Sequence, residues 1–336
     1  MRRKHGVLGA AVLGLCLLSV AWARASDVDE DLMGQRRWFG NIGPGLRAVK
    51  RGADGKYYVL ASPNVGVAIF DANGKQLGVI GPPPPAPVTN KAGRAAIAFA
   101  EDCDVDVQGN VYVADRGFNV LNEFSPAGQL IRSIPVDEPV SVAALSDGEV
   151  AVTTLRAAHL VNVYGPSGKI AREFGDPEDV STREELNRFL NIGKLSSDPK
   201  GRIYYGYLYL PEPLVRQYDR FGYAGTNFEF TGIDAYPEAQ SVRKAIASQE
   251  KLSKPPFFHQ VLTAFGVDPV SGDVWMASHN TLLHFDKDGN RRSEYRIYTK
   301  DGARLEANTI LVEPERLLIG ADPLGVYEFQ RPDRSH

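Results

Sequence analysis

The chain contains very little cysteine. Cys16 and Cys103 are the only cysteines among 336 residues, which excludes a scaffold held by several disulfides and a cysteine-rich zinc site. Basic residues are not in excess either, because 38 Lys and Arg stand against 41 Asp and Glu. Nucleic-acid binding draws most of its affinity from a basic surface, so we expect no nucleic-acid partner. The sequence also lacks a glycine-rich phosphate loop, a nucleophile elbow and an HExxH motif, and so offers no ready catalytic motif.

Only the N-terminus carries a long apolar run. Residues 2–4 are basic, residues 7–23 are apolar, and Ala23-Arg24-Ala25 fits the small-residue pattern that a signal peptidase cleaves. We therefore predict a signal peptide over residues 1–25 and an exported protein, periplasmic or secreted, with no transmembrane span after cleavage. The alternative is a retained membrane anchor, although a run of 17 residues is short for a bilayer. Cleavage removes four basic residues and leaves 34 Lys and Arg against 41 Asp and Glu, a net charge of −7.

An aromatic residue followed by a glycine four positions later recurs five times along the chain. Each copy lies between strand-like segments, and the glycine supplies the positive φ that a tight hairpin turn needs. A second glycine turn precedes each aromatic residue by 13 to 17 positions, so each unit is predicted to be a four-stranded antiparallel sheet. The pairs are Phe70 with Gly74, Phe124 with Gly128, Tyr164 with Gly168, Tyr218 with Gly222 and Phe285 with Gly289, and the earlier turn glycines are Gly55, Gly109, Gly148, Gly201 and Gly272.

A sixth unit is incomplete at the C-terminus. Residues 309–330 supply three strands, with Phe329 in the aromatic position, and the chain stops soon afterwards. Residues 34–40 resemble the fourth strands of other units and can supply the missing one. Pairing the two ends closes a ring and removes an exposed sheet edge. The sequence thus predicts an all-β protein: a single domain over residues 26–336 that forms a six-bladed β-propeller, with the N-terminal strand closing the last blade.

The second unit carries a recognisable motif. Its residues Gly109-Asn-Val-Tyr-Val-Ala-Asp115-Arg-Gly-Phe-Asn119, with Phe124 and Gly128 behind them, resemble a blade of the NHL-type propeller family. As an architecture the resemblance covers roughly residues 34–332, while the motif itself is confined to blade 2. It implies the six-bladed fold and says little about activity, since propellers host both enzymes and binding modules.

Strand order separates the two faces of such a ring. The connections between second and third strands, and those between blades, share one face, here called the insertion face. Three long insertions fall there, over residues 81–100, 176–190 and 231–260, whereas the opposite turn face carries only short glycine turns. Ser181 with Glu184 predicts a capping box opening a helix in the second insertion, and apolar spacing over residues 237–252 predicts another in the third. These short helices either brace the ring or form a docking surface.

Polar and aromatic side chains on the insertion face are candidates for ligand binding. They suit hydrogen bonding to, and stacking on, a peptide, a glycan or a protein surface. Our leading hypothesis is therefore a non-enzymatic exported module that binds an extracytoplasmic peptide, glycan or protein on the insertion face. The candidate residues are Asp115, Arg116, Asn119, Tyr207, Tyr209 and His279.

A second set of polar residues lies near the entries of the first strands and would rim the central channel. This set comprises Asp102, Asn191, His259 and Asn308. Carboxylate, amide and imidazole ligands of this kind can bind Ca²⁺ or Zn²⁺. The arrangement loosely resembles the gluconolactonase-like and amidating-lyase propellers, whose metal ligands come from equivalent strand entries. That resemblance implies the alternative function, a metal-dependent hydrolase or lyase, although no ligand motif matches residue by residue.

Overall fold

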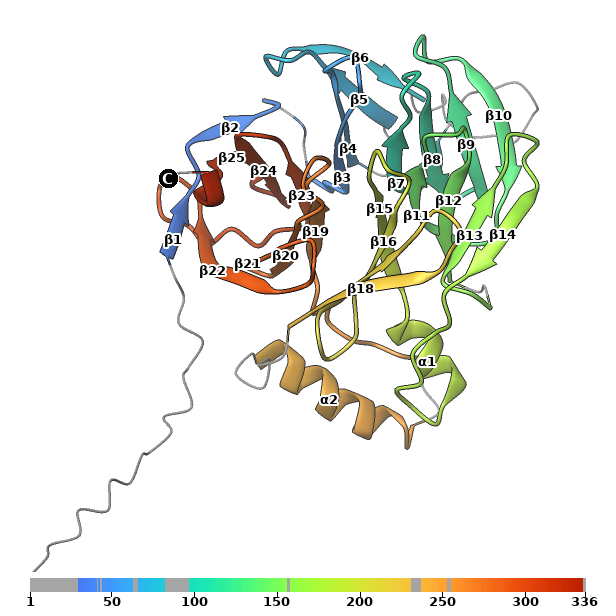
Figure 1. Cartoon of the computed structure of the whole chain (residues 1–336), viewed down its shortest axis with the longest axis vertical. Coiled ribbons are helices and arrows are strands. Elements are labelled where there is room, and N and C mark those ends of the chain that lie inside the picture. The colour runs from blue at the N-terminus through green and yellow to red at the C-terminus, as the bar shows by residue number, and fades with distance from the viewer. Residues whose placement is uncertain are drawn as a thin grey trace, which may run out of the picture.

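The computed structural model describes residues 30–40, 42, 44–62, 66–81, 97–155, 158–230, 237–252 and 255–334. Their strands form six sheets arranged in a ring, so the chain is a six-bladed β-propeller (Figure 1). The first strand of each blade is the innermost one. The predicted signal peptide and residues 82–96 of the first insertion lie outside the described residues. None of the helices in the described part is both long enough and apolar enough to cross a bilayer.

Each blade contains four consecutive antiparallel strands, except that blade 6 takes its outer strand from the N-terminus. Blade 1 consists of β3 (Ala48–Arg51), β4 (Tyr57–Ser62), β5 (Gly66–Phe70) and β6 (Gln76–Ile80). Blade 2 consists of β7 (Ala100–Val105), β8 (Val111–Asp115), β9 (Val120–Phe124) and β10 (Leu130–Pro135). Blade 3 consists of β11 (Pro139–Ala144), β12 (Val150–Thr154), β13 (Val161–Tyr164) and β14 (Ile170–Phe174). Blade 4 consists of β15 (Gly193–Ser197), β16 (Ile203–Tyr207), β17 (Leu214–Tyr218) and β18 (Ala224–Glu229). Blade 5 contains β19 (Ala264–Val267), β20 (Val274–Ser278), β21 (Thr281–Phe285) and β22 (Arg291–Tyr298). Blade 6 consists of β23 (Thr309–Val312), β24 (Arg316–Ala321), β25 (Gly325–Gln330) and β2 (Arg36–Trp38).

The repeat predicted from the sequence coincides with the blades. Gly74 and Gly128 have φ values of 82° and 77°, which a residue with a Cβ adopts only with strain. The aromatic residue four positions before each of them, Phe70 or Phe124, ends the third strand and is buried between blades. The turn glycine and the buried ring therefore fix the same hairpin in blades 1 to 5, and the spacing between them could be seen in the sequence.

The N-terminal strand closes the ring as expected. β2 pairs antiparallel with β25, with Trp38 opposite Val326. Trp38 is 3% exposed and packs in a core cluster with residues of blades 1 and 6. A further strand was not anticipated: β1 (Glu30–Met33) adds to blade 5 as a fifth strand, parallel to β22. Only Leu32 of β1 is buried, so the strand covers the edge of blade 5 and contributes little to its core.

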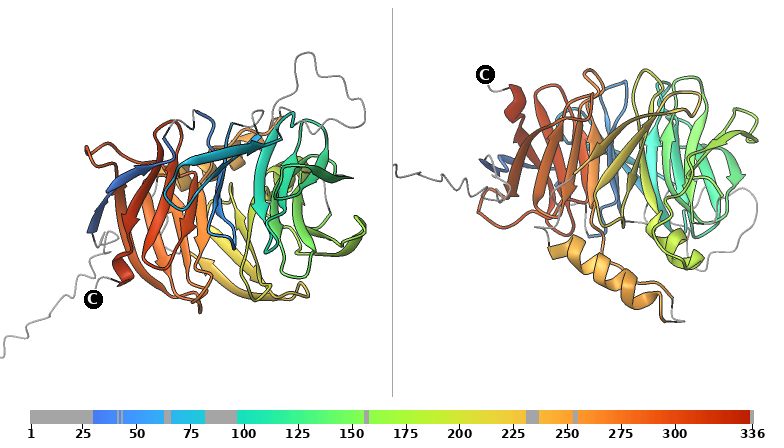
Figure 2. Two further views of the ribbon diagram at one scale, coloured as in Figure 1. Left: turned by 90° about the horizontal axis from the view of Figure 1, so that it is seen from above. Right: turned by 60° about the horizontal axis from the view of Figure 1, so that its bottom comes forward.

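Two helices occur in the described part of the insertions, α1 (Glu184–Leu190) and α2 (Pro237–Gln249). They lie beside each other, away from the inner strands, at the outer edge of the ring (Figures 1 and 2). Leu186, Leu190, Val242 and Ile246 are buried in one cluster with the strands of blade 4. Both helices thus brace blade 4.

The predicted capping box is wrong. Arg183 is the residue that precedes α1, and no side chain caps the helix. The hydroxyl of Ser181 instead donates a hydrogen bond of 2.8 Å to Glu250 Oε1, just beyond the end of α2. Ser181 therefore joins the two insertions, a contact that local sequence spacing does not reveal.

Candidate functional site

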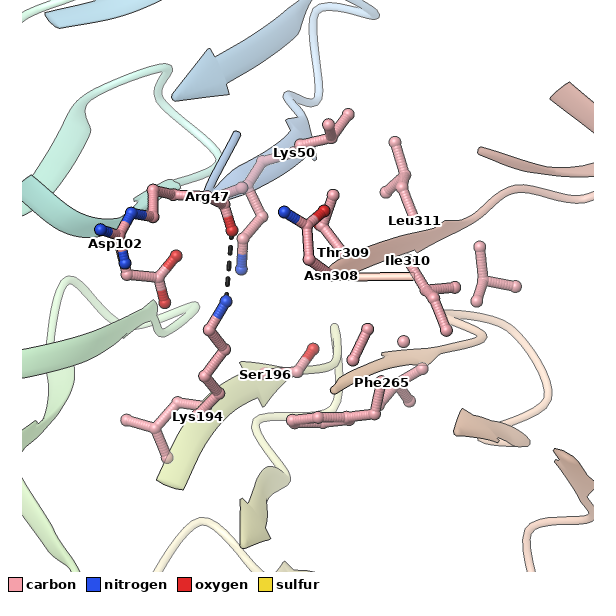
Figure 3. A pocket seen from close by; sticks show the side chains of 17 residues that line it. Arg47, Lys50, Asp102, Lys194, Ser196, Phe265, Asn308, Thr309, Ile310 and Leu311 are labelled. Atoms are coloured by element: carbon pink, nitrogen blue, oxygen red, sulfur yellow. Dashed lines mark hydrogen bonds between the residues drawn. The ribbon is translucent and has the colours of Figure 1, made fainter. Parts of the chain in front are cut away.

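The inner strands of five blades surround a small cavity in the central channel. Its volume is about 80 Å³, and its walls come from β3, β7, β15, β19 and β23. Two lysines enter it from different blades. Figure 3 shows Lys50 of β3 and Lys194 of β15 extending toward each other, with Asp102 of β7 and Asn308 beside them. In the first strand of a blade, alternate side chains face the channel, which places these groups in its interior.

A larger vestibule of about 490 Å³ adjoins this cavity on the turn face. The two spaces share five lining residues, Lys50, Ser196, Val267, Leu311 and Val312. Pro199, Pro269 and Pro314 line the vestibule where the glycine turns meet. The walls that lead from the turn face down to Lys50 are mixed, because the carboxylates of Asp104, Asp106, Asp198 and Glu313 line them together with these prolines. The sequence predicts a site on the insertion face, whereas this vestibule lies on the opposite face.

Lys50 is held as a cation. Its ammonium Nζ lies 3.6 Å from Asp104 Oδ1, and Asp104 Oδ2 accepts a hydrogen bond of 2.9 Å from the backbone nitrogen of Ala144. Burial by itself lowers the pKa of Lys50, but the charges of Asp104 and Asp102 outweigh burial and raise the pKa above its ordinary value. Lys50 therefore stays protonated at neutral pH.

Lys194 has a different environment. Its ammonium donates one hydrogen bond, of 3.2 Å, to the backbone carbonyl of Arg47. Burial lowers the pKa of Lys194, Asp102 opposes that shift, and the charges of Lys50 and Arg47 add to it, so the pKa lies below its ordinary value. Within the described ranges Lys194 forms no ion pair, and an amine with three donors uses one of them.

Asp102 is held in place without a salt bridge to either lysine. One of its oxygens accepts a hydrogen bond of 2.9 Å from the backbone nitrogen of Cys103, and the other accepts one from Ser141 Oγ. Ser141 Oγ in turn accepts a hydrogen bond of 2.9 Å from the backbone nitrogen of Leu195, the residue after Lys194. A polar chain therefore links the carboxylate of blade 2 to the lysine strand of blade 4.

On the insertion face, the rim beside this cavity is closed by an ion-pair network. One carboxylate oxygen of Glu101 forms an ion pair with the guanidinium of Arg47 at 3.0 Å, and the other forms one with the guanidinium of Arg116 at 2.7 Å. Both guanidinium groups also lie over the ring of Phe99, at 5.5 and 5.3 Å from its centre. Arg116, one of the expected ligand residues, thus belongs to a network that already neutralises much of its charge.

Two other expected ligand residues hold the same loop together. Asp115 is fully buried and accepts hydrogen bonds from the backbone nitrogens of Ala98 (2.8 Å), Phe99 (2.9 Å) and Gly117 (3.0 Å). Asn119 has a φ of 53°, and its side-chain oxygen accepts a bond of 3.0 Å from the backbone nitrogen of Glu138. Asp115 is thus committed to its own loop, whereas Asn119 is exposed and uses its side-chain oxygen in this contact.

The expected tyrosines lie beneath the helices. Tyr207 is fully buried, and its hydroxyl accepts a hydrogen bond of 3.2 Å from Arg216, so it is not available for stacking. The ring of Tyr209 packs on Phe189 of α1, with 4.7 Å between ring centres. His279, on blade 5, lies 3.8 Å from Glu306 through its Nδ1. The six expected ligand residues therefore do not converge, and none of them lines either channel cavity.

The four expected metal ligands are also separated. Asp102 and Asn308 line the channel cavity, but Asn191 ends α1 and hydrogen-bonds the carbonyls of Glu178 and Asn187 at 2.8 Å each. His259 is exposed, with its ring against Phe257. One ion cannot contact all four. The two lysine ammonium groups also share the cavity with Asp102, and positive charge there opposes the entry of a cation.

A different group brings three ligand-type atoms within 4.8 Å of one another: Asp273, His284 and Asp333. Asp333 is paired with Arg331 at 2.6 Å, and His284 stacks on Trp275 with 4.2 Å between ring centres. Arg331 is fully buried and also pairs with Asp268 at 2.6 Å. The cluster is thus an ion-pair network that fastens the C-terminal segment to blade 5.

Sequence reasoning missed Lys50 and Lys194. Each is a charged residue in a short, otherwise uncharged stretch of first strand, Ala48-Val49-Lys50 and Gly193-Lys194-Leu195. A charge at that position signals the channel only once the ring is closed, because the same pattern in an open sheet indicates a solvent-facing side chain.

Comparison with known proteins identifies the fold of the chain but not its family or its function. No family model matches the chain, and no curated protein matches it. Among solved structures, a gluconolactonase from Xanthomonas campestris is similar at 15% identity, with 91% of this chain and 96% of that chain covered and a TM-score of 0.54. A virginiamycin B lyase from Staphylococcus aureus, an inactive variant solved with quinupristin, is similar at 13% identity, with 87% and 82% covered and a TM-score of 0.53.

The WD40 repeats of RRP9 give the same TM-score of 0.53 at 10% identity, with 88% of this chain and 96% of that chain covered. Two enzymes of different activity and a WD40-repeat domain are thus equally similar to this chain. Their shared likeness shows the six-bladed propeller fold.

Proposed function

We propose that this protein is an exported binding module that takes the acidic end of a ligand into its central channel from the turn face. One observation carries the proposal: Lys50 and Lys194 extend into a single cavity that adjoins a larger vestibule of about 490 Å³. Small-molecule sites are commonly hollows of roughly 300–1,000 Å³ with apolar walls and a few polar groups that fix orientation.

The charged groups of the channel cavity favour a ligand that carries a carboxylate. Lys194 is a half-buried amine with one hydrogen-bond acceptor, and removing a charge from water without partners is costly. A carboxylate at the base of the vestibule supplies acceptors to Lys194 and to Lys50 together. The apolar body of the ligand then lies against Pro199, Pro269 and Pro314.

The ligand class is an acid with an apolar body, such as a small organic acid, an acidic sugar or the C-terminal end of an extracytoplasmic peptide. Export rests on the signal-type segment over residues 1–25, which is cleaved in this proposal. The blade 2 motif supports placing the chain with NHL-type propellers, and Asp115 of that motif anchors its loop. The binding face then differs from the insertion face that the sequence favoured.

A metal-dependent hydrolase or lyase is the second candidate. It is favoured by the presence of Asp102 and Asn308 in one cavity, and two of the similar propellers are enzymes by name, a gluconolactonase and a lyase. It is opposed by the two lysines in that same cavity. We therefore rank it below the binding module.

Calorimetric titration of the purified protein tests the proposal. The ligands are apolar peptides with free or amidated C-termini, and hexanoate against hexanamide, so that the two sources of a carboxylate are compared. We expect the free acid of at least one pair to bind at least tenfold more tightly than its amide, because a charged hydrogen bond contributes about 1.5–3 kcal/mol. Equal binding of acid and amide in both pairs would contradict the proposal.

Two variants locate the site. Lys50→Met combined with Asp104→Asn removes the ion pair without leaving either charge buried alone, and it should weaken acid binding by roughly tenfold or more. The matched control is Lys287→Met, since Lys287 is an exposed lysine paired with Asp288 on the surface. The control should bind as the wild type does. If acid binding weakens equally in both variants, the acid does not bind in the channel and the proposed site is wrong.

A further inference from the structure

We infer that Lys194 is a nucleophilic amine that forms an imine with its ligand, and that the ligand of the channel is a 2-oxo acid whose carboxylate lies against Lys50. The inference rests on the proposed function and narrows its ligand class. It also assigns different roles to the two lysines, one chemical and one electrostatic.

The position of Lys194 gives its amine access to a ligand. Lys194 is the second residue of β15, and its side chain crosses the channel toward Lys50 (Figure 3). The only hydrogen bond of its Nζ within the described ranges is the one of 3.2 Å to the carbonyl of Arg47. No carboxylate is paired with it there, so a ligand can approach the nitrogen without first breaking a salt bridge.

The environment of Lys194 raises the neutral fraction of its amine above that of an exposed lysine. Lys50 of β3 and Arg47, just before that strand, are cations on the far side of the channel, whereas Asp102 and Glu101 are anions from blade 2. Burial and the two cations together outweigh the anions, and the pKa of Lys194 is lowered. A lysine buried next to another cation is a recognised form of activated nucleophile, since only the neutral amine carries a free electron pair.

Lys50 cannot take this role. Its ion pair with Asp104 at 3.6 Å keeps it protonated, so it offers a fixed positive charge to an anion. The two lysine ends approach each other within one cavity of about 80 Å³. A 2-oxo acid carries its carbonyl carbon directly beside its carboxylate, so one small head group reaches Lys194 and Lys50 together. Its remaining part extends into the vestibule.

The reaction is a reversible condensation that balances without any further reagent. The electron pair of Lys194 Nζ attacks the carbonyl carbon, a C–N bond forms, and the C–O π electrons move to oxygen, which takes a proton. The nitrogen then loses a proton, the hydroxyl leaves as water after accepting another, and a C=N bond remains. Asp102, held by Ser141 and the backbone of Cys103, is the carboxylate of this cavity that can carry the proton. No redox change occurs.

Reductive trapping on the wild-type protein provides the test. The full mature protein is incubated with pyruvate, glyoxylate or phenylpyruvate and with cyanoborohydride, and each modified lysine is identified by peptide mapping. We expect Lys194 to be modified severalfold faster than the exposed Lys287 and Lys56, because a lowered pKa raises the neutral fraction of the amine. Modification of Lys194 no faster than of these surface lysines would overturn the inference.

Variants and analogues separate this inference from the proposed function. Lys194→Arg should abolish the channel modification while leaving surface labelling unchanged, and the double variant Lys50→Met with Asp104→Asn should slow it at least fivefold. Lactate has the carboxylate without the carbonyl and should compete. If lactate or hexanoate binds but pyruvate is never trapped at Lys194, the imine fails and the carboxylate site stands. If acetone, a ketone without a carboxylate, and pyruvate modify Lys194 equally fast, the 2-oxo acid assignment fails, and with it the role of Lys50.

Discussion

Trp38 Nε1 donates a hydrogen bond of 2.6 Å to Glu328 Oε2, so two residues separated by 290 positions in the chain meet in blade 6. The indole also lies 5.6 Å from the ring of Tyr57 in blade 1, and the guanidinium of Arg316 lies 4.3 Å above it. Trp38 therefore joins the N-terminal strand to both the last blade and the first. Ring closure depends on this contact rather than on the three-residue ladder of β2 alone.

Replacing Trp38 with alanine should destabilise the protein strongly. The substitution removes a large buried side chain and its hydrogen bond, so we expect a loss of about 3–5 kcal/mol in the free energy of unfolding, measured by urea denaturation. Met33→Ala, in the neighbouring strand β1, is the control because Met33 is 46% exposed, and it should change the value by less than about 0.5 kcal/mol. Equal losses in the two variants would show that β2 does not close the ring.

Asp115→Ala should loosen the loop of blade 2 without touching the channel. Three backbone N–H groups would lose their acceptor in a buried site, at a cost of at least about 2 kcal/mol. Hydrogen exchange at Phe99 and Gly117 should accelerate in the variant. Asp54→Ala is the matched control, since Asp54 accepts a backbone bond in an exposed turn. Unchanged protection of the Phe99 amide would contradict the assigned role of Asp115.

The fold followed from the sequence because its signals are local. Gly74 and Gly128 have the positive φ that a hairpin turn requires, and the buried aromatic four residues earlier repeats with them. The closing strand was visible because its sequence resembles the outer strands of other blades. β1 was not visible, since one buried residue, Leu32, leaves too weak a pattern to detect.

The site did not follow in the same way, because its geometry depends on contacts between distant blades. Tyr207 looked available for stacking, but it is fully buried, with its ring 4.8 Å from that of Tyr205 and its hydroxyl bonded to Arg216. Asn191 looked like a strand-entry ligand, but it ends α1 with its side chain bonded to backbone carbonyls. Lys50 lies in blade 1 and Lys194 in blade 4, so the two residues meet only across the closed channel.

The free energy of unfolding should depend on pH through the carboxyl group of Asp286. Burial alone raises the pKa of this carboxyl, but hydrogen bonds from Asn290 and Asp288 and the charge of Arg292 outweigh burial and lower the pKa to about 2. A carboxyl whose folded-state pKa is depressed stabilises the fold at a pH above its unfolded value of about 3.9, and that contribution is lost as the pH falls toward 2. Urea denaturation of the wild type and Asp286→Asn should therefore differ most at pH 6 and converge toward pH 2.5. A constant difference across this range would contradict the role of the ionised carboxylate.

Metal removal distinguishes the two functions. In the binding module, Lys50 and Lys194 supply the positive charge of the channel, so dialysis against EDTA should leave the melting temperature unchanged, and added Ca²⁺ or Zn²⁺ should not raise it. A resident ion present at 100 times its Kd would instead contribute about 2.7 kcal/mol, enough to shift the melting temperature by a few degrees. The informative variant is Asn308→Ala, whose side chain donates to the carbonyl of Leu46 at 2.6 Å. If EDTA lowers the melting temperature, Ca²⁺ restores it, and Asn308→Ala abolishes that response, the channel holds a metal and the hydrolase or lyase becomes the better assignment.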